Sequence, residues 1–338
     1  MIIEQNLRDL LVHENKNPYY IFSPQYSVQS AGIKVLHYLC HYLNLAGFPS
    51  FMVYKKFRPK YNLNPNIISP PLDINVINCH KYNNINPIVI YPDIAKKKYF
   101  GETTFFTYLL NYPGLLGGSS NFEDSENIFV YSKKIGQKSS KNFHVLFMPV
   151  INTQVFYEDK KIVRDNNLSY FYASKYRYFH KGEVLDITNK SIEITRNLPD
   201  SPTQKQIADC LRKSNFFATY EDTSLITESI LCGCPVMLIK NNYFDGIPLA
   251  YHELGIEGCF SDTNIKNLEK NILKSKLEIP LAIEKYKASI NNFNTDLENF
   301  INITQKEASK HEFPKNFAIE NFLPFPQKEF YQIKKFIN

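Results

Sequence analysis

The sequence predicts an α/β fold in which short parallel strands alternate with helices in both halves of the chain. In the first half, an apolar strand at 19–24 is followed by a small polar loop at 25–32. A helix-spaced apolar pattern at 33–45 and a second strand at 50–54 come next. This order is one βαβ unit, and sheets built from such units bind ligands beyond the carboxyl ends of their strands. The alternation returns in the second half, so we expect two Rossmann-like, doubly wound domains.

The first domain is expected to span residues 1–155, because the pattern becomes polar and charged between 149 and 165. Short apolar runs bounded by turn residues identify its further elements. They are strands at 88–91, 128–131 and 145–148, and a helix at 103–110.

The second domain is expected to span residues 156–312, and a tail over 313–338 could cross back to the first domain. Thr203 stands directly before a helical pattern and can cap its first turn. The expected strands are 168–172, 191–195, 215–218 and 235–239, and the expected helices are 203–212, 266–273 and 282–302.

The composition indicates a globular protein, since 43% of its 338 residues are hydrophobic and 21% are charged. The net charge of +6 suits an anionic substrate or a negatively charged membrane surface. The six cysteines form no Cys-x-x-Cys pair, so we expect buried thiols and no metal. No apolar run approaches the roughly 18–20 residues that span a bilayer, so we expect a cytoplasmic protein. Dispersed lysines argue against a nucleic-acid partner.

Residues 219–236 are the most informative stretch of the chain. They predict an acidic, hydroxyl-rich loop, a short helix, a glycine turn and a buried strand. The amino end of a helix suits a phosphate, and Thr223 and Ser224 add hydroxyl donors there. Glu228 follows about one helical turn later and can accept hydrogen bonds from paired sugar hydroxyls. The stretch therefore predicts a site for a phosphate and for the paired hydroxyls of a sugar.

The same stretch resembles the donor-binding segment of GT-B glycosyltransferases like those of glycosyltransferase family 4. In that family a Glu precedes Ala/Ser-x-x-x-Cys-Gly-x-Pro-Val, and residues 228–236 match this frame. The family's first acidic residue lies eight positions earlier, where this chain has Tyr220, followed by Glu221 and Asp222. The resemblance implies donor-binding roles for Tyr220 and Glu221, and a catalytic and donor-binding role for Glu228.

A second resemblance, to bacterial surface-polysaccharide glycosyltransferases, lies in the first half. Its residues are the strand end at 88–93 and the Leu-Leu-Asn-Tyr-Pro-Gly run at 109–114. Residues 95–100 stand where that family has Gly-Asn-Pro, which points to a different acceptor. The resemblance implies two domains facing across a cleft. It also implies transfer of a sugar from a nucleotide-sugar to a glycan or lipid-linked acceptor, as in capsule, O-antigen or lipooligosaccharide synthesis.

Transfer of a sugar releases a nucleotide diphosphate whose growing negative charge needs cations. The Asp-x-Asp spacing of metal-dependent transferases does not occur in the sequence, which favours metal-free chemistry with no cofactor. Lys175 follows an expected strand and is the first candidate for the diphosphate, and Arg177 and Arg196 are the next. Each could equally be a solvated surface charge. Gly32 is expected to let the loop after the first strand approach a ligand closely.

An inverting transferase also needs a base that takes the proton of the acceptor hydroxyl. Asp93 ends a strand in the first domain and is the leading candidate, although a turn aspartate after Pro92 would look the same. His144 and His180 are weaker candidates. His37 and its neighbour four residues on, His41, are more typical of partly buried helix histidines than of a metal pair.

Two other functions fit the same architecture. A nucleotide-sugar epimerase would release free nucleotide and an altered sugar without any acceptor. A non-catalytic binding or scaffold protein would keep the fold, and Tyr220 at the acidic position favours it. The basic, aromatic segments at 55–61 and 96–100 could also contact the inner face of the plasma membrane.

Overall fold

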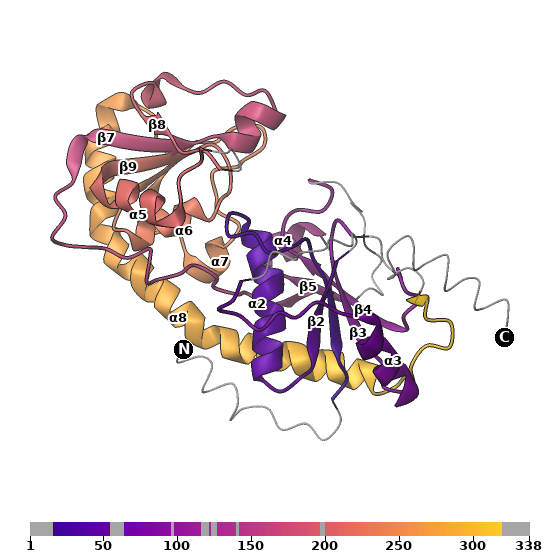
Figure 1. Ribbon diagram of the computed structural model, residues 1–338. Helices are drawn as coiled ribbons and strands as arrows, with labels where there is room; N and C mark the ends of the chain where they lie inside the picture. The colour runs from indigo at the N-terminus through magenta and orange to yellow at the C-terminus, as the bar shows by residue number, and fades with distance from the viewer. Residues whose placement is uncertain are drawn as a thin grey trace. The chain divides into compact units, whose positions relative to one another are not determined.

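The computed structural model describes residues 16–54, 64–95, 98–115, 122, 127–139, 142–196 and 200–319. The chain divides into two compact units, Met1–Val150 with Ile290–Asn338, and Ile151–Ser289. Each unit holds one parallel sheet with helices beside it (Figure 1). The predicted fold class, α/β with two sheets of the Rossmann type, is confirmed. Within the described ranges, no helix combines the length and the apolar character that a bilayer crossing needs.

The first unit is built on six parallel strands, which are β1 (Tyr19–Phe22), β2 (Ser50–Val53), β3 (Ile88–Pro92), β4 (Thr104–Leu109), β5 (Ile128–Val130) and β6 (His144–Val145). Their order in the sheet is β2-β1-β3-β4-β5-β6. The chain moves from β1 outward to β2 and then returns to the other side of β1 with β3. The winding direction therefore reverses between β1 and β3, and sheets of this kind bind ligands at such a reversal.

Strand β1 is buried on both faces, as its continuous apolar sequence predicts. Tyr19 and Ile21 pack in one core cluster with α2 (Ala31–Leu45), and Tyr20 and Phe22 pack in a second cluster. Helix α2 begins two residues earlier than expected, and the Ser30 hydroxyl accepts from the Ile33 N–H at 3.4 Å. The unit also contains α3 (Ile74–Tyr82) and α4 (Lys133–Ser139).

Residues 104–109 form strand β4, so the helix predicted at 103–110 is wrong. The segment Thr-Phe-Phe-Thr-Tyr-Leu is rich in β-branched and aromatic residues, which favour strands. It pairs in parallel with β3, with Thr104 opposite Ile88 and Tyr108 opposite Pro92. Tyr108 is fully buried and donates its hydroxyl proton to the Leu146 carbonyl at 2.5 Å. The periodicity of such a short apolar run does not separate the two structures, and pairing in the sheet decides between them.

One continuous helix, α8 (Leu268–Ala308), replaces the two helices predicted at 266–273 and 282–302. It is 41 residues long and contains Pro280. The proline ring lies on the exposed side of the helix, between the buried residues Ile279 and Ala282. The free energy gained by burying the residues on both sides of Pro280 is larger than the cost of the one backbone hydrogen bond that proline removes.

The last part of α8 belongs to the first unit. Phe293 and Phe300 are buried in the same cluster as β1 and α2. The Gln305 amide exchanges two hydrogen bonds with the Asn17 backbone, since it accepts from the N–H at 2.8 Å and donates to the carbonyl at 2.9 Å. The chain therefore returns to the first unit at residue 290, which corrects the predicted second domain of 156–312.

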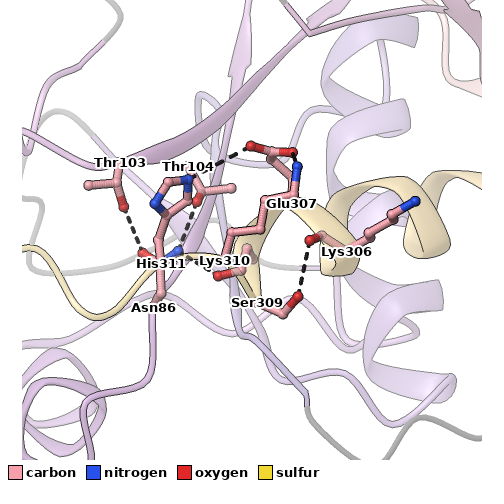
Figure 2. Close-up of polar contacts among 9 residues, drawn as sticks. Asn86, Thr103, Thr104, Lys306, Glu307, Ser309, Lys310 and His311 are labelled. Carbon is pink, nitrogen blue, oxygen red and sulfur yellow. Dashed lines mark hydrogen bonds and ion pairs between the residues drawn. The ribbon is translucent and has the colours of Figure 1, made fainter.

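Polar contacts around Asn86 hold the sheet and the end of α8 in place (Figure 2). The Asn86 amide donates to the Thr104 hydroxyl at 2.8 Å and to the Ala308 carbonyl at 3.2 Å. Its oxygen accepts from the Thr103 hydroxyl at 3.1 Å. Asn86 is nearly fully buried, so these bonds replace the water that its amide loses.

The described part of the tail, residues 313–319, also packs on the first unit. The Phe317 ring stacks on Phe100 with centroids 4.9 Å apart, and the Ala318 N–H donates to the Phe100 carbonyl at 2.8 Å. Phe313 and Ile319 are buried in the same cluster. The rest of the tail, 320–338, lies outside the described residues.

The second unit is built on five parallel strands, which are β7 (Asp165–Tyr172), β8 (Ile192–Glu193), β9 (Ser214–Thr219), β10 (Val236–Leu238) and β11 (Cys259–Phe260). Their order is β11-β10-β9-β7-β8, so the winding reverses between β7 and β9. The predicted cap holds, because the Thr203 hydroxyl accepts from the Gln206 N–H at 3.3 Å. The helices are α5 (Gln204–Lys213), α6 (Leu225–Leu231), α7 (Tyr251–Leu254) and the π-helical turn η1 (Lys175–Phe179).

Candidate functional site

The candidate site in the second unit lies at the carboxyl edge of its sheet, where the winding reverses. β7 ends at Tyr172 directly beside Thr219, the last residue of β9. The turn η1 follows β7 and the acidic loop 220–224 follows β9, so both segments leave the sheet at the same place. The reversal of a doubly wound sheet is where ligands of such folds bind. Because β7 and β9 are neighbours in the sheet, the predicted donor segment lies beside the segment that carries Lys175.

Glu221 connects the two segments. Its carboxylate accepts a hydrogen bond from the Tyr176 backbone N–H at 2.9 Å. Burial raises the pKa of the Glu221 carboxyl, and the Tyr176 N–H, the Lys175 charge and the neighbouring His180 ring partly oppose this. Lys175 is exposed, so its ammonium remains accessible to solvent. The predicted pair Lys175 and Glu221 is thus brought together, with His180 beside it.

Tyr220 is turned into the protein and is about 1% exposed. Its hydroxyl accepts from the Leu185 N–H at 2.7 Å and bonds the Thr188 hydroxyl at 2.7 Å. Its ring stacks on Tyr176 with centroids 5.2 Å apart. These contacts hold the segment after η1 in place, so the residue at the family's acidic position supports the site from within and offers no group to a ligand.

Glu228 has no exposed surface, and both of its carboxylate oxygens are engaged. Oε2 lies 2.7 Å from Arg196 Nη2, and Oε1 accepts from the Ser224 hydroxyl at 2.9 Å. Arg196 Nη1 donates to the Ser224 oxygen at 3.2 Å. A buried carboxylate needs a charged partner and hydrogen bonds, and this network supplies both. Glu228 was predicted to bind sugar hydroxyls. In the structure its carboxylate binds Arg196 and Ser224 instead.

The other hydroxyl and basic residues of the prediction have local partners. The Thr223 hydroxyl accepts from the Leu225 N–H, at the first residue of α6, at 3.3 Å. Arg177 forms an ion pair with Glu193 on β8. The Arg177 guanidinium also lies 5.5 Å from the centroid of the Tyr178 ring. Both residues shape the segments around the site, and Lys175 is the exposed cation beside Glu221.

Exposed aromatic rings that were not among the predicted site residues lie at the same edge. The rings of His180 and Tyr243 stack with centroids 3.7 Å apart and an interplanar angle of 13°. Phe179 is 73% exposed and Tyr243 54% exposed. Tyr243 follows β10 and Phe179 ends η1, so the same rule that selected Lys175, a position just past a strand, could have selected them. Exposed rings at this edge suit the flat face of a base or a sugar.

The first unit has a second polar site at the reversal between β1 and β3. Ser23 follows β1 and Asp93 follows β3, and both residues are more than nine-tenths buried. Among the described residues, the Ser23 hydroxyl oxygen and Asp93 Oδ2 have no hydrogen-bond partner. Burial raises the pKa of Asp93, and the N–H groups of Asp93 itself and Ile94 partly oppose this. A buried polar atom without a partner costs about 1–3 kcal/mol, which a bound hydroxyl could recover.

The remaining predicted residues of the first unit are structural. Gly32 lies in the first turn of α2, and an added Cβ would meet Leu110 at an ordinary 3.5 Å, so the predicted need for glycine is not seen. The His37 ring bonds the Pro24 carbonyl at 3.0 Å, and His41 accepts from the Ile68 N–H at 2.9 Å.

Three further expectations concern His144, the membrane-contact segments and a metal. His144 packs its ring against Phe129 with centroids 5.4 Å apart. The segment 55–61 lies outside the described residues, as do residues 96 and 97. Phe100, the last residue of the second membrane-contact segment, is buried in the core. The described ranges hold no group of three His, Cys, Asp or Glu placed to bind a metal.

Comparison with known proteins gives similarity of structure alone, since no family model and no curated protein sequence matches the chain. One similar structure is a UDP-glucosyltransferase from Polygonum tinctorium, at 10% identity over 87% of this chain and 100% of that chain, with a TM-score of 0.47. Another is WaaG, a glycosyltransferase involved in lipopolysaccharide biosynthesis, at 9% identity over 85% and 99%, with a TM-score of 0.44. A third, named as a UDP-N-acetylglucosamine 2-epimerase from Listeria monocytogenes, has 13% identity over 90% and 100%, with a TM-score of 0.45.

Proposed function

We propose that this chain is a GT-B glycosyltransferase that works without a metal and whose donor segment resembles that of family 4. It transfers a sugar from a nucleotide-sugar to a glycan or lipid-linked acceptor of a bacterial surface polysaccharide. The observation that carries the proposal is the cluster of Lys175, Glu221 and His180 at the reversal of the second sheet. The motif at 228–236, which leads into β10 of the same sheet, supports it.

The donor is assigned to the second unit. Lys175 is an exposed ammonium and His180 a second basic group, and both suit the diphosphate that leaves during transfer. The exposed rings of Phe179 and Tyr243 offer a face to the base or the sugar. Arg196, held by Glu228 and Ser224, fixes the segment after β8 next to α6.

The acceptor hydroxyl is assigned to Asp93 in the first unit. The hydroxyl oxygen forms a bond to the anomeric carbon as the bond from that carbon to the diphosphate breaks. Asp93 Oδ2 takes the hydroxyl proton, and the nucleoside diphosphate leaves with the electron pair. The raised pKa of Asp93 makes its carboxylate a stronger base than an exposed aspartate.

A thermal-shift screen against UDP, GDP, CMP, dTDP and ADP and their sugars, with and without EDTA, tests the donor site. A ligand at 100 times its dissociation constant stabilises a protein by about 2.7 kcal/mol, which is readily visible. A shift with one nucleotide that EDTA leaves unchanged is expected, followed by acceptor-dependent release of that nucleotide from its sugar. Release without an acceptor, together with an altered sugar, would instead indicate an epimerase.

A binding protein without turnover is the second candidate. The buried Tyr220 and the closed network around Glu228 favour it, because the two acidic positions of the family motif offer nothing to a ligand here. Tight nucleotide binding with no release of nucleotide in the presence of bacterial glycolipid extracts would support this candidate and contradict the transferase.

A further inference from the structure

A stripe of leucines lies on the exposed face of α8. Leu273, Leu277 and Leu281 are 63%, 83% and 53% exposed. They are four residues apart, and residues at this spacing lie above one another on one helix face. Single exposed apolar residues are common on protein surfaces, but three in a row along one helix form a continuous apolar surface that suits a partner.

The charges at the two ends of the stripe are opposite. Lys270 lies seven residues before Leu277 and Glu284 lies seven residues after it, so both share its face. Both side chains are exposed. The ion pair that Glu284 makes with Lys287, at 2.9 Å, is also exposed and therefore weak. The stripe thus has a positive end, an apolar centre and a negative end.

This pattern is complementary to itself in one orientation. When two copies of the helix lie antiparallel with Leu277 opposite Leu277, Leu273 faces Leu281 and Lys270 faces Glu284. Glu269, eight residues before the centre, then faces the region of Lys285, whose ammonium already pairs with Glu257 of its own chain, so Lys270 and Glu284 carry the charge match. A parallel arrangement would set Lys270 against Lys270, which is unfavourable. A twofold axis through the centre is also the commonest symmetry of homodimers.

We propose that a second copy of this chain docks antiparallel on the Leu273–Leu277–Leu281 stripe, with the twofold axis at Leu277. Two helices packed in this way interdigitate their leucines and place the charges at the rim, as in an antiparallel coiled coil. Three leucines from each copy cover less area than a standard stable interface. The dimer is therefore concentration-dependent, with monomer at high dilution.

Sedimentation velocity of the full chain, from low micromolar to several hundred micromolar concentration, tests the apolar centre. The wild type is expected to pass from monomer to dimer, and Leu277→Glu to weaken the dimer roughly 100-fold. Val163→Glu is the matched control, because Val163 is 89% exposed and lies outside α8. Unchanged far-UV circular dichroism checks that each variant is folded.

Charge reversal tests the orientation. Lys270→Glu and Glu284→Lys are each expected to weaken the dimer about tenfold, because each sets like charges opposite one another. The double reversal restores the opposite pair and is expected to restore the dimer. A wild type that stays monomeric, or a double reversal without recovery, would overturn the proposal. So would a monomer that binds anionic vesicles through Leu277, since that result assigns the stripe to a lipid surface.

Discussion

Arg196 and Glu228 form a buried ion pair, with Nη2 and Oε2 2.7 Å apart, that ties the segment after β8 to α6. Glu228 is 0% exposed and Arg196 8% exposed, so neither charge is solvated by water. The Ser224 hydroxyl bonds both partners. The pair therefore fixes the geometry of two segments at the carboxyl edge of the second sheet.

Removing one partner of this pair is expected to be costly. Glu228→Ala leaves the Arg196 charge buried without its counter-ion and should lower the free energy of unfolding by about 3–5 kcal/mol. Urea denaturation measures this, and Arg177→Ala is the control, since its ion pair with Glu193 is partly exposed and its loss should cost about 0–1 kcal/mol. Equal losses in the two variants would contradict a closed, buried network.

Lys175→Ala is expected to weaken binding of the nucleoside diphosphate about 10–100-fold, because it removes an ammonium that bonds charged oxygens. Binding of the matching nucleoside, which has no phosphate, should not change. Calorimetric titration of both ligands separates the two effects, and Lys205→Ala, an exposed lysine on α5, is the control. Equal loss for nucleoside and diphosphate would remove Lys175 from the phosphate site.

Asp93→Asn is expected to slow transfer about 100- to 10,000-fold, because the amide cannot take the hydroxyl proton. Nucleotide binding should persist. The active form of Asp93 is the carboxylate and burial raises its pKa, so wild-type activity should fall as pH drops through that raised pKa. A pH–rate profile measures this, and full activity in the variant would exclude Asp93 as the base.

Asp296 on α8 should make stability depend on pH. Burial raises its pKa from 3.8 to about 6, and the Phe147 N–H partly opposes this. The folded state therefore holds a proton that the unfolded state loses, so stability should fall as pH rises from about 4 to about 6. The expected loss is roughly 3 kcal/mol. The urea midpoint of the wild type should fall with pH across this window, and that of Asp296→Asn should not. Equal pH dependence in the two proteins would contradict the raised pKa of Asp296.

Several parts of the fold followed directly from local pattern. The βαβ unit around α2 and the capped start of α5 depend on apolar spacing and on one capping residue each. The segment 104–109 did not follow, because a six-residue apolar run has no periodicity of its own and is fixed by β3 and β5 on either side. The two helices expected at 266–273 and 282–302 form one helix, α8, because buried residues on both sides of Pro280 hold it in a single helix.

Only those site residues that directly follow a strand could be predicted from the sequence. Lys175, Glu221 and Asp93 could be selected because a position just past a strand reaches the ligand edge of a parallel sheet. Tyr220 and Glu228 could not be assigned correctly, since their partners Thr188 and Arg196 lie 32 residues away in the chain. The stacked pair His180 and Tyr243 brings together segments after β7 and β10, which no local pattern connects.

The α/β class, most of the strands and the residues that follow them can be predicted from local pattern, because apolar runs, turns and caps act over a few neighbours. Which polar groups stay at the surface and which are paired inside the protein depends on contacts between distant parts of the chain. Glu228 shows the reason, since a carboxylate that loses water must find charge and hydrogen bonds elsewhere in the fold. Arg196 and Ser224 supply them, and Lys175 remains at the surface.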